Sequence, residues 1–257
     1  MKEIFKNYIL KKLKTNKENY KKNWNNKNFI QTKHLIIDNL LPEKYCEKIF
    51  NEFPINKNNF AKFNSFREKK KTCSLIKKYN PIISGIFDAI QDTAVVKQIS
   101  EITNLNNLEP DPSSYAGGLS MMSKGDFLNP HIDNSHDRNK RVYRKLNLLY
   151  YVTPEWEECF GGNFELWDEK VKKRKEITSK FNRLVIMETN KQSWHSVNPV
   201  ITDKIRCCVS NYYFSPVSSY KKDYYHVTSF TGRPNEKFKR LYSYVDNFLR
   251  NKASNII

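Results

Sequence analysis

The chain has 257 residues, of which 39% are hydrophobic and 14% aromatic, and its formal net charge is +18. This length suits one domain with terminal extensions, and the composition supplies a core rich in Phe and Tyr. No stretch reaches the roughly 18 apolar residues that span a bilayer, and the first residues lack the cleavage site of a secretory signal. The five cysteines form no CxxC pair, so we expect a reduced, cytoplasmic setting.

The positive charge comes from 45 Lys and Arg residues against 27 Asp and Glu residues. Such an excess has two explanations: an acidic partner such as nucleic acid, anionic lipid or a phosphorylated intermediate, or a solvated basic surface. The basic residues are spread along the whole chain, without an RNP-like or zinc-knuckle pattern. Nucleic acid is therefore a candidate partner that the pattern does not favour.

The first 103 residues are mainly helical in pattern, with one short apolar run suited to a strand. Apolar residues at helical spacing predict a basic amphipathic helix near the N-terminus, which we expect to pack on the rest of the chain. Pro42 suits the first turn of a helix, and Asp92 marks a break between two others. The expected elements are a helix and polar linker in 1–30, a strand in 34–38, a helix in 42–52, a loop in 54–80, and one or two helices in 81–103.

From residue 115 the pattern changes to short apolar runs separated by Gly, Pro, Asn and Asp. The runs are 117–122, 127–132, 144–152, 163–167, 183–188, 193–198 and 204–214. Seven such strands predict a mainly β domain, a sandwich or barrel. Five of the seven glycines lie between 117 and 162, which indicates tight turns or close backbone approach there. The tail 234–250 returns to helical spacing.

Two histidines and one aspartate in this β region have the pattern of a metal site. His131 and Asp133 are two residues apart, so on a strand they point to the same face. His195 comes late in the β region and can supply a third ligand from a facing strand. Two His and one carboxylate form the facial triad of Fe(II) oxygenases, although a zinc hydrolase can use the same ligands.

Arg206 follows His195 by eleven residues, at the start of the last apolar run. We expect a hairpin that returns its guanidinium to the same pocket. An Arg within an apolar strand needs a buried anion or an edge position, and its planar fork suits a carboxylate of 2-oxoglutarate. Alternation places Arg206, Cys208, Ser210 and Tyr212 on one face, where Ser210 can add a hydrogen bond to that carboxylate.

Residues 103–214 resemble the prolyl-4-hydroxylase-like branch of the Fe(II)/2-oxoglutarate oxygenases. The motifs that carry this resemblance are Glu109 to Pro112, Gly117-Gly118, Gly125 to Leu128, His131 to Asp133, Arg144 to Tyr151, Trp156, Gly161 to Trp167, Asn182 to Ile186, Trp194-His195 and Arg206 to Phe214. The run 34–52 also resembles the entry to the family's domain. Two departures from the family's pattern concern the co-substrate: Met121, Met122 and Ser123 replace a segment that often holds Tyr, and Cys208 stands where Ser is frequent.

The resemblance implies a mainly β fold with flanking helices around a double-stranded β-helix, or jelly-roll, core. His131, Asp133 and His195 would hold Fe(II), and Arg206 would bind 2-oxoglutarate. Asn147 would lie near the co-substrate, on the same inward strand face as Tyr151. Dioxygen is the further co-substrate, and ascorbate is a candidate reductant.

The implied domain order is a basic N-terminal helical extension (1–30), the oxygenase domain (31–230) and a C-terminal helix packed on or trailing it (231–257). The implied reaction hydroxylates an unactivated C–H bond of a prolyl or other protein residue, or of a small metabolite, and releases succinate and CO2. The same chemistry on a nucleotide- or lipid-linked sugar is one alternative. A non-catalytic basic module that binds nucleic acid is another.

The substrate and the oligomeric state are not determined by these patterns. Basic residues flank the HxD segment and suggest an electropositive approach for an acidic substrate, although a solvated loop explains them equally well. These residues are Lys124, Arg138, Lys140, Arg141 and Arg144. We also considered His136, Asp137 and Arg144 as residues of the substrate mouth.

Overall fold

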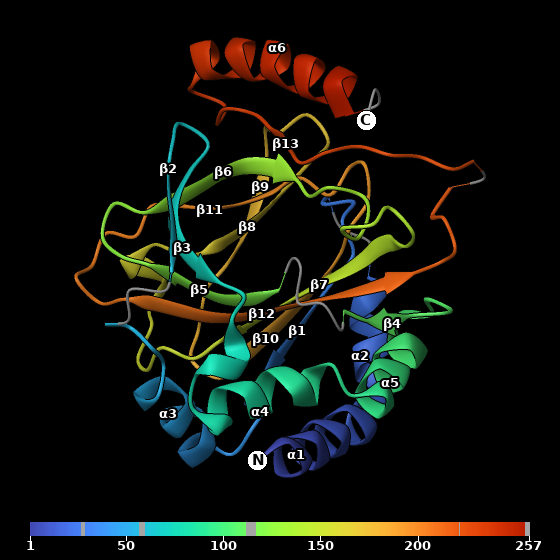
Figure 1. The fold of residues 1–257 in the computed structure, drawn as a ribbon, viewed down its shortest axis with the longest axis vertical. Coiled ribbons are helices and arrows are strands. Elements are labelled where there is room, and N and C mark those ends of the chain that lie inside the picture. The colour runs from blue at the N-terminus through green and yellow to red at the C-terminus, as the bar shows by residue number, and fades with distance from the viewer. Residues whose placement is uncertain (27–28, 57–59, 112–116, 221, 255–257) are drawn as a thin grey trace.

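The computed structural model describes residues 1–26, 29–56, 60–111, 117–220 and 222–254. A curled antiparallel sheet forms its centre, and helices cover one side (Figure 1). The strand order is β1-β10-β7-β12-β5-β3-β6-β11-β8-β9, with β2, β4 and β13 attached at β3, β12 and β6. This curled sheet is the jelly-roll core that the sequence predicts.

Every strand pairing in the sheet is antiparallel. The bounds are β1 His34–Asp38, β2 Ala61–Asn64, β3 Glu68–Cys73, β4 Glu109–Pro110, β5 Gly118–Met122, β6 Phe127–Ile132, β7 Tyr143–Tyr151, β8 Phe164–Trp167, β9 Arg174–Ile177, β10 Arg183–Glu188, β11 His195–Val197, β12 Arg206–Ser215 and β13 Ser229–Phe230. All seven strands expected after residue 115 are present. Pro112, which ends one of the motifs, lies outside the described residues.

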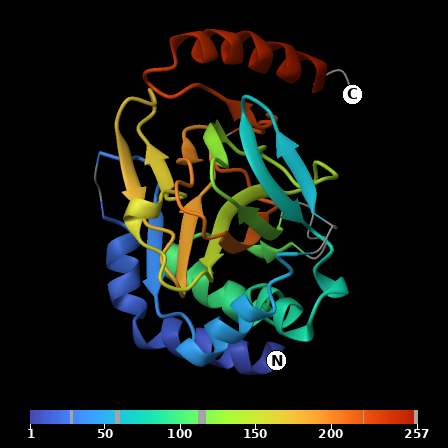
Figure 2. The same cartoon turned by 90° about the vertical axis from the view of Figure 1, so that its left-hand side faces the viewer.

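Of the six helices in the described residues, five pack beneath the sheet and the last lies across the opposite end of the molecule (Figure 2). The bounds are α1 Lys2–Thr15, α2 Lys17–Trp24, α3 Glu43–Asn51, α4 Pro81–Ile90, α5 Thr93–Thr103 and α6 Lys237–Ser254, with 3-10 turns at Ile76–Lys78 and Glu158–Phe160. Asn80 and Asp92 cap α4 and α5 by accepting hydrogen bonds from Ile82 N and Ala94 N. The cap at Asp92 is the break that the sequence predicts.

The main core lies between the helices and the outer face of the sheet. Strand β7 shows the alternation: Leu146, Leu148 and Tyr150 face this core, whereas Leu149 and Tyr151 face the barrel interior. Helix α1 joins the same core through Phe5, Ile9 and Leu13, which are fully buried. The N-terminal helix therefore packs on the rest of the chain, as expected. No described helix is long and apolar enough to cross a membrane.

The expected loop in 54–80 is wrong, because this segment contains the hairpin of β2 and β3. The side chains of β2 are exposed and those of β3 are mostly half-buried. Such strands need no hydrophobic alternation, so the charged sequence gave no signal for them. Strand β3 pairs with both β5 and β6, and it thereby brings Lys70 and Thr72 to the open end of the barrel.

Candidate active site

The two histidines of the predicted metal site lie directly opposite each other on neighbouring strands. His131 is on β6 and pairs in register with His195 on β11. Asp133 follows the last residue of β6. All three side chains are buried, and one donor atom of each lies within 4.8 Å of the others. The fold therefore brings together the three residues that the sequence selected.

Hydrogen bonds set the orientation of both imidazole rings. Nδ1 of His131 lies 3.0 Å from the carbonyl oxygen of Asn129, and Nδ1 of His195 lies 2.9 Å from that of Ser193. Because a carbonyl only accepts, each Nδ1 carries the proton and each Nε2 is left with a free lone pair. The two Nε2 atoms lie 3.5 and 3.8 Å from the Asp133 carboxylate. This is the tautomer that metal-binding histidines require.

The electrostatics of the cluster keep the donors in their metal-binding protonation states. Burial raises the pKa of Asp133, but His131, His195 and Arg144 lower it by more, so the pKa lies well below its ordinary 3.8. Burial and the neighbouring His131 lower the pKa of His195 to about 3, which leaves that ring neutral. No described residue donates a hydrogen bond to Asp133 Oδ2, although Arg144 lies 3.4 Å away. A buried carboxylate oxygen without a hydrogen bond fits a metal ligand.

A cavity of about 120 Å³ opens beside these three residues. Its walls come from both halves of the barrel, and one wall is strand β12. The residues that line it are Lys70, Thr72, Gly117, Gly118, Leu119, Ser120, Met122, Leu128, His131, Asp133, Asn147, Leu149, Phe164, His195, Val197, Arg206, Cys208, Ser210 and Tyr212. The four predicted inward positions of β12 all line the cavity.

Arg206 supplies a buried positive charge to this cavity. Its Nε donates to Ser179 Oγ at 2.9 Å, and its guanidinium lies over the Tyr151 ring, 4.7 Å from the ring centroid. Gly162 has φ +63°, and a Cβ there would lie 2.9 Å from Arg206 Cδ, so glycine makes room for the side chain. No carboxylate pairs with Arg206 among the described residues. A buried guanidinium without a carboxylate calls for an anionic ligand.

The predicted co-substrate residues take two positions. Asn147 and Ser210 line the cavity, and Asn147 Oδ1 has no hydrogen-bond partner in the described structure. Tyr151 lies behind Arg206 rather than in the cavity wall, with its hydroxyl also without a partner. Ser179, which no sequence pattern selects, accepts from the Arg206 guanidinium and donates to Gly162 O at 2.7 Å.

The expected hairpin between His195 and Arg206 is wrong. Strand β11 pairs with β6 and β8, whereas β12 pairs with β4, β5 and β7, so the two strands are not neighbours. The connection crosses from one side of the barrel to the other. Arg206 therefore reaches the cavity from across the barrel, and eleven residues are enough for this crossing.

The residues considered for the substrate mouth lie elsewhere. Arg144 is buried beside Asp133, with its guanidinium 4.2 Å from the centroid of the Tyr212 ring. His136 is buried and bonded to Ser135 Oγ at 2.7 Å. Asp137 accepts from main-chain N–H groups of its own loop. None of the three lines the cavity.

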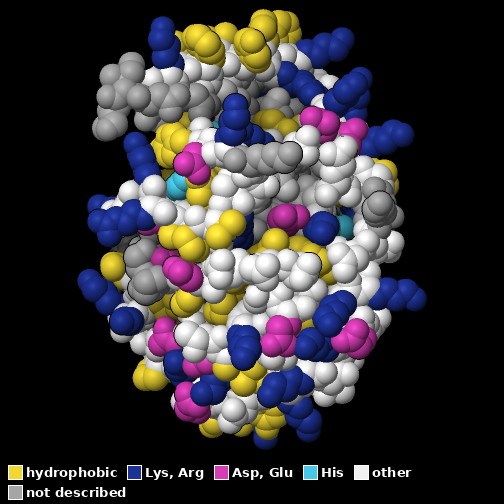
Figure 3. Space-filling model, turned by 90° about the vertical axis from the view of Figure 1, so that its right-hand side faces the viewer, with side chains coloured by type: hydrophobic (Ala, Val, Ile, Leu, Met, Phe, Trp, Pro, Cys, Tyr) yellow, Lys and Arg dark blue, Asp and Glu magenta, His cyan; other side chains and the backbone are white. Residues whose placement is uncertain are grey.

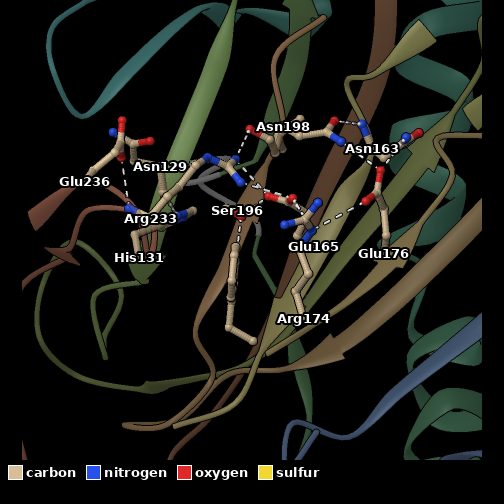
Figure 4. A network of polar contacts seen from close by, with 12 residues as sticks. Asn129, His131, Asn163, Glu165, Arg174, Glu176, Ser196, Asn198, Arg233 and Glu236 are labelled. Atoms are coloured by element: carbon tan, nitrogen blue, oxygen red, sulfur yellow. Dashed lines mark hydrogen bonds and ion pairs between the residues drawn. The ribbon is translucent and has the colours of Figure 1, made fainter. Parts of the chain in front are cut away.

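A buried polar network supports the strand that carries His195 (Figure 4). Glu165 on β8 is fully buried and accepts from Ser196 Oγ at 2.5 Å. Arg174 contacts the same carboxylate at 3.0 Å, and Arg233 contacts it at 2.8 and 3.1 Å. Arg233 lies between β13 and α6. The network thus ties the C-terminal segment to the back of the candidate metal site.

The fold and the cavity together define a class of protein, namely a jelly-roll with a cluster of two histidines and one carboxylate beside a buried arginine. Residues 117–214 match the model of the 2OG-Fe(II) oxygenase superfamily. A segment of 79 residues is 27% identical to prolyl 3-hydroxylase OGFOD1 of Mus musculus; it covers 28% of this chain but only 14% of that protein.

Solved structures of prolyl hydroxylases share the fold. A prolyl 4-hydroxylase of Phytophthora capsici has a TM-score of 0.60 and 15% identity, over 96% of this chain and 76% of that one. The prolyl hydroxylase of Trichoplax adhaerens, in complex with a hypoxia inducible factor peptide fragment, has a TM-score of 0.54 and 18% identity, over 82% and 89%.

Residues 117–214 thus match the 2OG-Fe(II) oxygenase superfamily, and the fold of the chain is that of the solved prolyl hydroxylases. Its cofactors are accordingly Fe(II) and 2-oxoglutarate. The site fits both: a buried His pair with Nε2 facing an ionised Asp suits Fe(II), and Arg206, which pairs with no described carboxylate, suits a dicarboxylate.

Proposed function

We propose that this chain is an Fe(II)- and 2-oxoglutarate-dependent dioxygenase that hydroxylates a prolyl-type residue of a protein. The observation that carries the proposal is the pairing of the His–Asp–His cluster with Arg206 in one cavity. A zinc hydrolase would need the three metal ligands but not a buried guanidinium free of carboxylates. A nucleic-acid binding module would need neither.

We assign roles to the residues as follows. His131, Asp133 and His195 hold the iron, and Arg206 binds the distal carboxylate of 2-oxoglutarate through a charge-assisted contact. Ser179 and the Tyr151 ring hold the guanidinium in place from behind. Ser210 and Asn147 offer polar groups to the co-substrate from the cavity wall.

Bound Fe(II), 2-oxoglutarate and dioxygen would supply the oxidising chemistry, with one oxygen atom of O2 entering the substrate as C–OH and the other entering succinate as 2-oxoglutarate loses CO2. The chain's own residues orient and shield. The Phe230 ring stacks on His131 at a centroid distance of 5.2 Å and covers the ligand from outside. Leu149, Phe164 and Val197 make part of the wall apolar, which limits water beside the reacting groups.

Three further points belong to this proposal. All residues that line the cavity fall within 31–230, which supports this range as the catalytic domain with 1–30 and 231–257 as extensions. The five free cysteines favour a reducing compartment, the cytoplasm.

The peptide substrates of related prolyl hydroxylases favour a protein substrate over a nucleotide- or lipid-linked sugar.

The test is formation of succinate from 2-oxoglutarate by the purified chain with Fe(II), dioxygen and ascorbate, across a panel of proline-containing peptides. We expect peptide-dependent succinate and a peptide product that gains one oxygen atom. Oxidation of a sugar substrate instead, with no peptide modified, would replace the prolyl assignment and keep the oxygenase. Absence of any 2-oxoglutarate turnover in iron-loaded protein that binds 2-oxoglutarate would reject the enzyme.

A further inference from the structure

Helix α6 is attached to the domain by its polar side. Asp246 forms an ion pair with Arg67 at 2.5 Å. The side chain of Asn247 donates to Phe230 O at 2.7 Å and accepts from Phe230 N at 3.0 Å. Ser243 on the same side is buried. These contacts fix the rotation of the helix about its own axis.

The opposite side of α6 is apolar and faces outward. Six large side chains are exposed there, and Phe238 is 90% exposed. They are Phe238, Leu241, Tyr244, Val245, Phe248 and Leu249, which we call the outer face of α6. Tyr242, at the border of this face, packs edge-on against Phe66 of the domain. A surface helix normally turns its apolar stripe toward the core. A contiguous apolar surface that points away from the core indicates contact with something outside the molecule.

The charges around the outer face are positive. Asp246 is the one acidic residue of α6, and Arg67 pairs it on the inner side. Glu236, just before the helix, is held by Lys239 and by Arg233 N. Lys237 and Lys252 are exposed near the two ends. Figure 3 shows hydrophobic side chains along the upper edge of the molecule, with Lys and Arg side chains beside them.

We propose that the outer face of α6 docks on an anionic phospholipid membrane surface. The helix lies across one end of the long axis of the molecule, so its apolar side chains can enter the headgroup region together (Figure 1). Lys237 and Lys252 then approach the lipid phosphates, and Tyr244 places its hydroxyl at the interface. The helix rests on the bilayer and does not span it.

The positive charge of the chain favours a lipid surface, rather than a second copy of the chain, as the partner of the outer face of α6. Pairing two outer faces would bring together the lysines of both helices and two chains of net charge +18. An anionic bilayer attracts the same charges, and each Lys near such a surface strengthens binding. The assignment does not depend on the proposed enzymatic function.

The test is co-sedimentation of the full chain with vesicles of phosphatidylcholine, with or without phosphatidylserine. We expect binding to the phosphatidylserine vesicles, weakened more than tenfold in Leu241→Gln/Phe248→Gln. Both side chains are exposed, so the fold is retained. Ile201→Gln is the matched control, because Ile201 is as exposed as Phe248, at 63%, and lies away from α6.

A second pair of variants tests the charges. Lys237→Gln/Lys252→Gln should weaken binding to phosphatidylserine vesicles more than Lys77→Gln/Lys78→Gln, which removes the same charge from an exposed turn elsewhere. Failure to bind either vesicle, or equal binding of the α6 variants and their controls, would overturn the proposal. Self-association that Leu241→Gln/Phe248→Gln abolishes, without vesicle binding, would assign the face to a second copy.

Discussion

Three histidines share one local arrangement but have different surroundings. His34, like His131 and His195, places Nδ1 about 3 Å from the carbonyl oxygen two residues earlier. Nε2 of His34 lies 2.8 Å from Lys175 Nζ, whereas the other two Nε2 atoms face Asp133. Local geometry alone therefore does not make a metal ligand. The feature that distinguishes the candidate ligands His131 and His195 from His34 is the Asp133 carboxylate beside Nε2.

This contrast leads to a prediction for iron binding. His195→Ala should lose stoichiometric Fe(II), because two remaining donors bind the ion far more weakly than three. His34→Ala removes a buried histidine with the same Nδ1 contact and should keep the iron. Anaerobic reconstitution followed by measurement of bound iron distinguishes the two. Equal iron content in both variants would remove His195 from the metal site.

The second prediction at this scale concerns Arg206. Arg206→Ala removes a desolvated charge-assisted contact worth on the order of 2–5 kcal/mol, so the Kd for 2-oxoglutarate should rise by at least about 30-fold. Iron binding should be unchanged, since Arg206 contacts none of the proposed ligands. Arg138→Ala, an exposed arginine, is the control. An unchanged Kd in Arg206→Ala would mean that another basic residue, such as Lys70, binds the co-substrate.

At the scale of elements, the first strand is held to the sheet by a half-buried ion pair. Asp38 on β1 lies opposite Arg183 on β10, and the guanidinium reaches both carboxylate oxygens at 2.6 and 2.9 Å. This contact lowers the pKa of Asp38 below 3.8 although partial burial opposes it. The ionised form therefore stabilises the folded state above that pH.

We predict that Asp38→Asn lowers the free energy of unfolding by about 1 kcal/mol at neutral pH, since the pair is partly screened by solvent. The difference from the unmodified protein should disappear as the pH falls below 3.8, because the folded-state carboxylate then becomes protonated. Urea unfolding across this range measures it. Asp203→Asn, at a side chain that is 88% exposed, should show little effect at any pH. A difference for Asp38→Asn that stays constant with pH would contradict the ionic explanation.

We expect the Glu165 network to hold the C-terminal segment in place through Arg233. Glu165→Gln leaves Arg233 without its buried partner, which should cost about 3 kcal/mol of stability. It should also speed tryptic cleavage between residues 216 and 236, because Arg233 is what ties this segment to β8. Glu169→Gln, at an exposed position, is the control. Unchanged stability and cleavage would show that β13 and α6 dock without Arg233.

At the scale of the whole molecule, the basic residues near the HxD segment differ in exposure, so only some of them can attract a substrate. Lys124, Arg138, Lys140 and Arg141 are exposed, whereas Arg144 is buried beside Asp133 and is no part of an approach surface. If the exposed four attract substrate, kcat/KM for an acidic peptide should fall as salt rises. Exposed charges are screened beyond about 10 Å at 0.1 M ionic strength. An equal salt response for a neutral peptide of the same length would leave these residues without a role in recognition.

The sequence by itself determined the candidate metal-binding residues, which the fold brings together, and the strand faces. The alternation of β12 places Arg206, Cys208 and Ser210 on the cavity side, as the two-residue period of a strand requires. The helix boundary at Asp92 also followed from the local sequence, and Asp92 caps α5 in the structure. These features depend on neighbours within a few positions, so a linear pattern carries them.

Only the tertiary structure decided which strands are neighbours. The crossing of β11 to β12, the polar hairpin of β2 and β3, and the position of Ser179 behind Arg206 depend on contacts between distant segments. The outward orientation of the apolar side of α6 also depends on contacts between distant segments. Helical spacing predicts an amphipathic helix, but the hydrogen bonds of Asn247 and the ion pair of Asp246 determine which side meets the domain. Periodicity predicts a polar and an apolar side of the helix, but the contacts of each side with the rest of the molecule determine which side faces the domain.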